Sequence, residues 1–454
     1  MMVAKIGVRS FLRQRRRNSF TLIAVMIGSA GLITLGGFVN RWENTLTNSS
    51  IYVNQAGTYS VYKRDGLLLA KTRPKTHAFS LEEQNKLTSF FAGDPQVEYV
   101  GRLLTMQGLV SNGCSSYPFE IKGYEPELFT KLRNRPEVLK WCFEILGLGE
   151  GLPFSHYQNK AVVGVAKGLA KSLNKNKVIK NADAAAPLVT DFNAYCHAPD
   201  SKQKIATDAN LQIMGVTLGG QFNASDVDIA HYYTTGTTVS DYSELTAPLS
   251  LVQNLYDTDR VSSLSIYMKS PQASEETARG LKDKIVKATG IDVDVYPWNN
   301  ELISPVYRGI MDFIWMMGLF FSLLIGSAVI LSVVNLTTIS VLDRSREIGT
   351  LKALGFRTGS IAYIFLVESL LIGTVGSFAG LGLSLLTNAF INEMNIQYFP
   401  TGFSGSAQFW ITPDPLISFS ILLFVFLLVT LSSLIASYVL SKRSCLELLT
   451  HNGG

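Results

Sequence analysis

The sequence has little charge and few residues of the kinds that bind metals. Only 17% of its 454 residues are charged, whereas 47% are hydrophobic. An ordinary soluble domain carries about 25% charged residues. The five histidines are scattered and no two of the four cysteines form a Cys-x-x-Cys pair, so the sequence predicts no metal site. Because the apolar residues are concentrated in a few blocks, the composition favours a membrane protein over a string of soluble domains.

Nucleotide-binding and nucleophile motifs are also missing. The segment nearest to a phosphate-binding loop runs from Gly164 to Lys171-Ser172, but it lacks the glycine before the lysine. No serine lies in a nucleophile elbow. We therefore expect a non-catalytic chain that itself binds no ATP, metal or other cofactor.

The net charge of +5 is unevenly distributed. The stretch from Arg41 to Arg308 holds 28 basic and 28 acidic residues, and the rest of the chain holds 12 basic and 7 acidic residues. A nucleic-acid-binding protein would carry a basic patch on a folded domain. Here the basic excess flanks apolar runs, so we expect no nucleic-acid partner.

Four apolar runs predict four transmembrane helices, at residues 18–40, 309–342, 358–390 and 415–440. The first run carries no charge from Asn18 to Asn40. As a helix it would be about 34 Å long, enough to cross a hydrocarbon core of about 30 Å. A cleaved signal peptide is the alternative, but its apolar part would be too long and no small-x-small site precedes Arg41. The second run, Phe313 to Leu342, exceeds the core thickness, so that helix either tilts or projects beyond the bilayer.

The positions of lysine and arginine predict the orientation of these helices. The loop 391–414 contains neither residue type, whereas basic residues precede the first run and follow the second and fourth. By the positive-inside rule, a basic N-terminal helix at 1–17, the segment 343–357 and the tail 441–454 lie in the cytoplasm. The loop 391–414 and the large segment 41–308 then lie outside the membrane.

The large outer segment has mixed α/β patterns. Ser80 and Glu83 form a capping box at the start of a helix. Further helices and strands are expected at Val97–Val110 (strand), Tyr117–Tyr124 (strand), Leu264–Met268 (strand), about Ser274–Thr289 (helix) and Ile291–Tyr296 (strand). The stretch at about 175–259 is richer in Asn, Asp, Thr and Gly, and we expect a second subdomain inserted there. The fold class is thus an integral membrane α-helical protein with four transmembrane helices and a large mixed α/β extracytoplasmic domain between the first two.

Three cysteines, Cys114, Cys142 and Cys196, fall in the outer segment. If that segment is exported, one disulfide can form among them and one thiol remains. Free buried thiols are the alternative, and the spacing does not decide between the two.

The segment Asp343 to Ile361 predicts a short helix between two membrane spans. Ile348, Leu351 and Leu354 recur at a spacing of three, which places them near one face. Gly355 supplies the left-handed position that commonly ends a helix. Its four basic residues keep this segment out of lipid. The alternative is an ordinary connecting loop that happens to be helical.

The order of residues in this segment resembles a known signature. Arg346-Glu347-Ile348-Gly349, followed by Leu351-Lys352-Ala353-Leu354-Gly355, is similar to the signature of FtsX-type (type VII) ABC transporter permeases, the group that includes MacB, LolC and LolE. The resemblance implies that 343–357 is a coupling helix that docks on a separate cytoplasmic ABC ATPase subunit, which would bind the ATP and Mg. The coupling residues carried over are Arg346, Glu347, Ile348, Gly349, Leu351, Lys352, Leu354 and Gly355.

The third span extends the resemblance. Residues 366–373, which include Glu368, are similar to the third span of the family. A carboxylate inside a span costs about 3 kcal/mol on insertion scales, so Glu368 should face a partner. Gly376 and Gly380 are a small-xxx-small pair, which serves either packing within the subunit or a dimer contact. Residues 161–170 resemble a strand–helix step of MacB-like periplasmic domains, and residues 57–64 resemble the opening strand of lipoprotein-releasing members.

The resemblance implies a permease subunit of the bacterial inner membrane. It would form a homodimer, or a heterodimer with a second permease, and would couple ATP hydrolysis by its partner to movements of its periplasmic domain. Its substrate would be a lipoprotein, peptide or amphiphile, with a periplasmic adaptor or lipoprotein as a further partner. The alternatives are an FtsX-like transmembrane regulator of a cell-wall enzyme and a membrane-anchored receptor without an ATPase.

Overall fold

The computed structural model describes residues 15–142, 150–157, 160–179, 196–235, 237–356, 358–399 and 406–441. The chain divides into two compact units. The helical unit takes the chain up to Glu43, Met311–Ile396 and the chain from Phe409 onward, and the α/β unit takes Asn44–Ile310 with Gln397–Gln408. Most of the N-terminal helix expected at 1–17 and nearly all of the tail expected at 441–454 lie outside the described residues.

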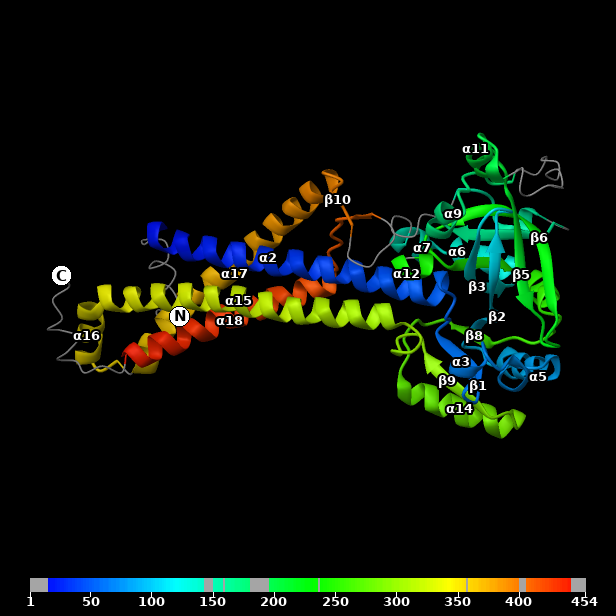
Figure 1. Ribbon diagram of the computed structural model, residues 1–454. Coiled ribbons are helices and arrows are strands. Elements are labelled where there is room, and N and C mark those ends of the chain that lie inside the picture. The colour runs from blue at the N-terminus through cyan, green and yellow to red at the C-terminus, as the bar shows by residue number, and fades with distance from the viewer. Residues whose placement is uncertain are drawn as a thin grey trace. The chain divides into compact units, whose positions relative to one another are not determined.

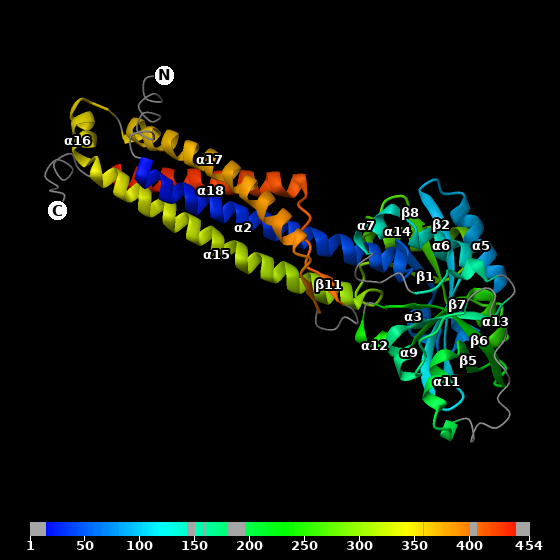
Figure 2. The same ribbon diagram turned by 90° about the horizontal axis from the view of Figure 1, so that it is seen from above.

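Four helices are long and apolar enough to cross a membrane. They are α2 (Arg15–Asn48), α15 (Pro305–Asp343), α17 (Thr358–Glu393) and α18 (Pro415–Ser441). Figures 1 and 2 show the parts of these helices that belong to the helical unit gathered in one bundle. A short helix, α16 (Ser345–Ala353), lies between α15 and α17 in sequence. The four expected spans are therefore all helical.

The first two long helices extend beyond the apolar runs that predicted them. α2 continues past Arg41 to Asn48, beyond the span predicted at 18–40, and is followed by a π-helical segment, Ser49–Val53. The charges that end the apolar run do not end the helix, because Arg, Trp and Glu are all compatible with helical backbone. α15 contains 39 residues, about 58 Å of helix. It begins at Pro305 rather than near residue 309.

The bundle is held together by β-branched side chains from all four long helices. Val25 of α2, Val329 of α15, Ile372 of α17 and Val429 of α18 belong to one buried cluster. Van der Waals packing of such side chains is one of the interactions that hold membrane helices together.

The α/β unit contains a nine-stranded sheet with the strand order β3-β7-β4-β6-β5-β2-β8-β1-β9, and β3 also pairs with β2. The strands are β1 (Tyr59–Lys63), β2 (Val97–Ser111), β3 (Ser116–Tyr124), β4 (Val162–Ala166), β5 (Asn210–Val216), β6 (Phe222–Tyr233), β7 (Glu244–Pro248), β8 (Ser263–Met268) and β9 (Val293–Pro297). The first part of β2 pairs with β8, and its second part pairs with β3 and β5. The strands β2 to β7 thus form a closed circuit of pairings, as in a small barrel.

Helices flank this sheet. They are α3 (Gly66–Leu69), α4 (Pro74–His77), α5 (Leu81–Ala92), α6 (Pro126–Arg133), α7 (Pro136–Trp141), α9 (Lys167–Ser172), α11 (Ser201–Thr207), α12 (Thr238–Asp241), α13 (Leu249–Leu255) and α14 (Glu275–Thr289). The capping box at Ser80 and Glu83 is confirmed. The expected strand–helix–strand unit is also confirmed as β8, α14 and β9, and α14 ends at Gly290 in the left-handed conformation.

The segment expected as an inserted subdomain, about 175–259, is not set apart from the rest of the α/β unit. Its strands β5, β6 and β7 pair with β2, β3 and β4, which lie outside that range. Its side chains Ile213, Ile229 and Leu245 are buried in the main core together with Val61 and Ile266. Composition could not show this, because strand pairing between distant segments leaves no local pattern.

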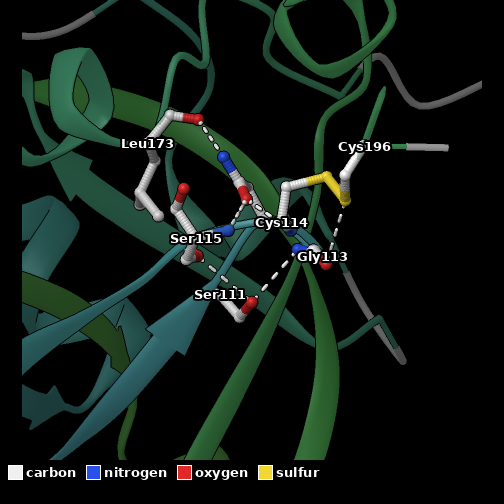
Figure 3. The surroundings of a disulfide bond; sticks show 7 residues. Ser111, Gly113, Cys114, Ser115, Leu173 and Cys196 are labelled. Carbon is white, nitrogen blue, oxygen red and sulfur yellow. Dashed lines mark hydrogen bonds between the residues drawn. A yellow bond between two sulfur atoms is a disulfide. The ribbon is translucent and has the colours of Figure 1, made fainter. Parts of the chain in front are cut away.

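One disulfide joins Cys114 to Cys196 (Figure 3). The buried Cys142 remains a thiol and donates a hydrogen bond to the Thr45 carbonyl at 3.6 Å. Cys114 lies in the β2–β3 turn, where the Asn112 side-chain oxygen accepts hydrogen bonds from the backbone N–H groups of Cys114 and Ser115. The Cα atoms of the two cysteines are 5.5 Å apart. This separation is usual for a disulfide. The structure thus shows one bridge and one thiol, which is the first of the two alternatives left open by the sequence.

Candidate functional site

The short helix α16 ends with a Schellman motif. The Gly355 N–H donates to the Lys352 carbonyl at 2.9 Å, and the Phe356 N–H donates to the Leu351 carbonyl at 3.0 Å. Gly355 has φ +88°, and a Cβ placed there would meet no atom within 4 Å. Gly355 is therefore required for its backbone conformation rather than for space, which confirms the helix end expected from the sequence.

The side chain of Ile348 does not lie on the outer face of α16. It is 3% exposed and packs in a cluster with Val341 of α15 and with Ile361 and Phe365 of α17. The expectation that Ile348 faces an external partner is therefore wrong. The spacing placed Ile348, Leu351 and Leu354 near one face, but of the three only Ile348 is buried by the chain's own helices.

The outer side of α16 carries different residues. Arg346, Glu347 and Leu354 are exposed, with Leu354 72% exposed. Phe356, just beyond the helix, is 45% exposed. The other expected coupling residues are less accessible: Gly349 is buried, and Leu351 and Lys352 are half-buried.

Glu368 lies buried in α17 and contacts residues from outside that helix. Its Oε2 atom is 4.0 Å from a guanidinium nitrogen of Arg344, which directly precedes α16. Its Oε1 atom accepts a hydrogen bond from the Asn18 side-chain amide of α2 at 3.3 Å. The expected partners for this carboxylate are thus provided by the segment 343–357 and by α2.

A small polar cavity of about 20 Å³ adjoins Glu368. Its volume suits a single water molecule. Thr337 of α15 donates a hydrogen bond to Ser433 of α18 at 3.2 Å beside it. The polar residues that line the cavity come from all four long helices: Thr21, Thr337, Ser340, Glu368, Ser369 and Ser433.

Gly376 and Gly380 contact α2 of the same chain. A Cβ on Gly376 would lie 2.8 Å from the Val25 side chain, and one on Gly380 would lie 2.7 Å from the Met26 carbonyl oxygen and would collide with Ser29. Of the two alternatives for this pair, the structure shows packing within the subunit.

The sequence interpretation missed Asn18 and Phe356. Asn18 begins the first apolar run, and a polar amide at the edge of such a run is a weak indication that it has a partner. Phe356 follows the helix-ending Gly355, at the position that commonly makes an apolar contact back to the last turn. Across the described ranges from 15 to 441, no cluster of three His, Cys, Asp or Glu side chains has the geometry for a metal ion.

Comparison with known proteins identifies the region that contains this site. Residues 319–445 match the family model described as FtsX-like permease C-terminal. The matched segment includes α16, Glu368 and both glycines of the pair.

Curated relatives match at low identity. The macrolide export ATP-binding/permease protein MacB of Neisseria meningitidis serogroup A is 28% identical over 170 residues, covering 37% of this chain and 26% of that protein. MacB of Sodalis glossinidius is 24% identical over 290 residues, which cover 62% of this chain and 41% of that protein. The uncharacterized ABC transporter permease YknZ of Bacillus subtilis is 28% identical over 152 residues, which cover 33% of this chain and 38% of that protein. The chain thus spans between a quarter and about two fifths of the length of these relatives.

Two solved structures are also similar. The periplasmic region of MacB from Actinobacillus actinomycetemcomitans matches with a TM-score of 0.33 and 11% identity, covering 55% of this chain and 94% of that one. The extracellular domain of the noncanonic ABC-type transporter YknZ from Gram-positive bacteria matches with a TM-score of 0.29 and 13% identity. The match covers 52% of this chain and 98% of that domain.

Proposed function

We propose that the chain is the membrane subunit of a MacB-like ABC system, because its residues 319–445 match the FtsX-like permease C-terminal family model. An ATPase subunit binds to α16 on the cytoplasmic side, and ATP hydrolysis there drives movement of the α/β unit outside the membrane. The observation that carries this proposal is the family match across α16 and Glu368. ATP and Mg belong to the ATPase in this scheme.

The docking surface on this chain is the outer side of α16. Leu354 and Phe356 offer an apolar anchor to a groove on the ATPase, a helix-in-groove mode of recognition. Arg346 and Glu347 beside them would set the register, since charges at a rim contribute specificity more than affinity. Ile348 supports this surface from beneath by fixing α16 to α15 and α17.

The long helix α15 would carry the movement. It runs without interruption from Pro305 to Asp343, and its C-terminal end is followed at once by Arg344 and α16. Arg344 also approaches Glu368 of α17. A displacement of α16 would therefore act on two membrane helices together.

Two observations support an orientation in which the α/β unit lies outside the bacterial inner membrane. Lysine and arginine are absent from the loop 391–414. The Cys114–Cys196 disulfide is of a kind that persists in oxidising compartments and is rare in the cytosol. With both termini inside, the α/β unit would act on a lipoprotein, peptide or amphiphile, in a complex of two permease chains, identical or different.

The test is a purification from membranes of the native host. Tagged wild-type chain should retain a protein with ATPase activity, whereas Leu354→Asp should lose that protein and the activity. Loss of a central interface anchor typically costs about 2 kcal/mol or more, roughly a thirtyfold loss of affinity. Leu354 is exposed in this chain, so Leu354→Asp should reach the membrane in normal amount.

Two control variants make the result specific. Leu354→Met keeps an apolar anchor and should retain the ATPase. Leu139→Asp introduces the same charge at an exposed leucine of the α/β unit and should also retain it. If Leu354→Asp kept its ATPase and its activity, docking on the outer side of α16 would be contradicted. If the wild-type chain itself retained no ATPase, a membrane receptor without an ATPase would become the better account.

A further inference from the structure

The α/β unit contains an open cavity of about 440 Å³ that no step of the proposed coupling uses. Every lining residue belongs to the α/β unit, between Thr45 and Tyr307. Small-molecule sites typically have volumes of roughly 300–1,000 Å³. A cavity of this size is therefore large enough for a ligand rather than for water alone.

The charged residues of the lining are balanced and already paired. Lys71 lies 2.6 Å from Glu120, and Lys122 lies 2.5 Å from Glu244. Burial acts to lower the pKa of Lys122, but the carboxylate of Glu244 holds it above its usual value, so this pair stays ionised. A charged ligand would have to break one of these pairs or remain uncompensated, which is costly away from water. The lining therefore favours an uncharged ligand.

Three apolar residues of the lining are accessible. Leu68, Leu302 and Val306 all line the cavity, and their side chains are 72%, 57% and 39% exposed. Serine hydroxyls of β8, those of Ser263 and Ser265, lie in the same lining and are buried. The lining thus combines accessible apolar side chains with hydroxyl groups, which suits a ligand with a hydrocarbon part and a polar, uncharged head.

Gln55 is the residue in this lining that indicates a specific contact. It is 5% exposed, and its side-chain Nε2 has no hydrogen-bond partner in the structure. Buried amide donors are nearly always paired, so an unpaired one at a cavity wall is a candidate ligand contact. A second buried glutamine, Gln84, shows the usual arrangement: its Nε2 donates to the carbonyls of Phe79 and Asp259.

The backbone at Gln55 is strained as well. Its φ is +55°. Residues other than glycine rarely adopt this conformation. The Ser265 hydroxyl donates to the Gln55 carbonyl at 2.6 Å and so holds this residue in place. Strain of this kind persists where the surrounding structure over-determines it, and it gathers at ligand-binding sites.

We propose that this cavity binds an uncharged amphiphile, with its hydrocarbon part against Leu68, Leu302 and Val306 and its head beside Gln55, whose buried Nε2 turns toward an oxygen acceptor of that head. Binding requires only the α/β unit, so it does not depend on whether an ATPase docks on α16.

The test uses the full chain in lipid nanodiscs with hexyl β-D-glucoside, well below micelle formation, measured by saturation-transfer NMR. Hexyl glucoside should bind saturably. Hexyl sulfate, with the same chain and a charged head, should not, and glucose, which lacks the chain, should bind at least about tenfold more weakly. Equal binding of hexyl sulfate, or equal binding of glucose, would overturn the proposed chemistry.

Two matched glutamine variants locate the site. Gln55→Met should weaken hexyl glucoside binding about tenfold or more, the effect of losing one buried donor. It should also raise the thermal midpoint without ligand, because it removes an unpaired amide. Gln84→Met should lower the midpoint, since it breaks two hydrogen bonds, and should leave binding unchanged. Wild-type affinity in a folded Gln55→Met protein would contradict the proposal.

A surface pair provides a test that does not depend on changing a buried residue. Leu302→Ser should weaken hexyl glucoside binding several-fold, because it removes exposed apolar surface from the wall. Leu139→Ser, at an exposed leucine that does not line the cavity, should leave it unchanged. Equal affinity of both variants and wild type would place the ligand elsewhere.

Discussion

At Glu368, contacts from two other parts of the helical unit offset the cost of carrying a carboxylate in a membrane span. Arg344 approaches one oxygen and Asn18 donates to the other. The sequence alone shows only that the glutamate raises the free energy of membrane insertion. It therefore predicts that Glu368→Leu inserts at least as well as wild type. The structure changes that expectation, because Arg344 has a side chain that is only 14% exposed and would lose its carboxylate partner.

A double-mutant cycle measures this pair. Glu368→Leu and Arg344→Met should each lower the thermal stability of the purified chain, because a buried charge without its partner is strongly destabilising. The double variant should recover part of the loss, with an interaction energy of about 0.5–3 kcal/mol. Additive losses would show that the two side chains are not coupled. Transport should fall in Glu368→Leu in either case.

His231, in β6, is a titratable group of the α/β unit that is strongly affected by its surroundings. Its ring lies 4.7 Å from that of Phe154 and 6.1 Å from that of Phe129, and it is 5% exposed. Burial, followed by the positive charge of Arg133, lowers the pKa of His231 to about 3. The folded protein therefore holds this histidine neutral where the unfolded chain would protonate it.

The sign of the resulting pH dependence follows from that difference. Below about pH 6.5 the unfolded state binds a proton that the folded state does not, so the free energy of unfolding should fall by up to about 1.4 kcal/mol per pH unit as the pH drops toward about 3. Above about pH 6.5 the contribution of His231 should be constant. His231→Phe should flatten this slope in thermal unfolding measured across that range. An unchanged slope in a folded variant would assign the acid sensitivity to other groups.

At the scale of single elements, α17 shows how two glycines set the distance between helices. Gly376 and Gly380 face Val25, Met26 and Ser29 of α2, and neither has room for a methyl group. A glycine slightly further along the helix, Gly382, would meet no atom within 4 Å. Gly382 is therefore a control position, on the same helix, for substitutions at Gly376 and Gly380.

The matched pair is Gly380→Ala and Gly382→Ala. Gly380→Ala should lower the stability of the helical unit by about 1–3 kcal/mol, as overpacking does, because the Met26 carbonyl belongs to the backbone of α2 and cannot move aside easily. Gly382→Ala should be neutral or stabilise by up to about 1 kcal/mol through helix propensity. Thermal unfolding of both variants is the measurement. Equal stabilities would indicate that α2 and α17 separate more readily than the structure shows.

The elements that could be predicted are those whose cause is local. Ser80 and Glu83 predicted a helix start, Gly355 predicted a helix end, and the apolar patterns at Val97–Val110 and Leu264–Met268 predicted β2 and β8, all of which the structure confirms. Length and lack of charge predicted the four long helices in the same way.

What could not be predicted depends on partners distant in sequence. The spacing of Ile348 and Leu354 gives α16 an apolar side but does not reveal that Ile348 packs on Phe365 while Leu354 is exposed. The closed circuit of β2 to β7 likewise joins segments far apart in the chain, for example Glu120 with Glu244. Gln55 and the cavity that it lines could not be predicted either, because the lining comes from segments that are far apart in the sequence.

At the scale of the whole molecule, three features support the proposed function. Four helices are long and apolar enough to span it. The α/β unit has balanced charge and a disulfide, as exported domains often have. Residues 319–445 match a permease family and contain the short helix α16. The proposal that joins them is that an ATPase acts on α16 from the cytoplasmic side.

Site-specific cross-linking tests this proposal most directly. In native membranes, Leu354→Cys with a short bifunctional maleimide should give an adduct that contains an ABC ATPase, identified by mass spectrometry. Ser116→Cys, at an exposed position of the α/β unit, should give no such adduct but should react with an impermeant maleimide added to intact spheroplasts. Reaction of Leu354→Cys with that impermeant reagent from outside, or the absence of any ATPase adduct at Leu354→Cys, would contradict the account.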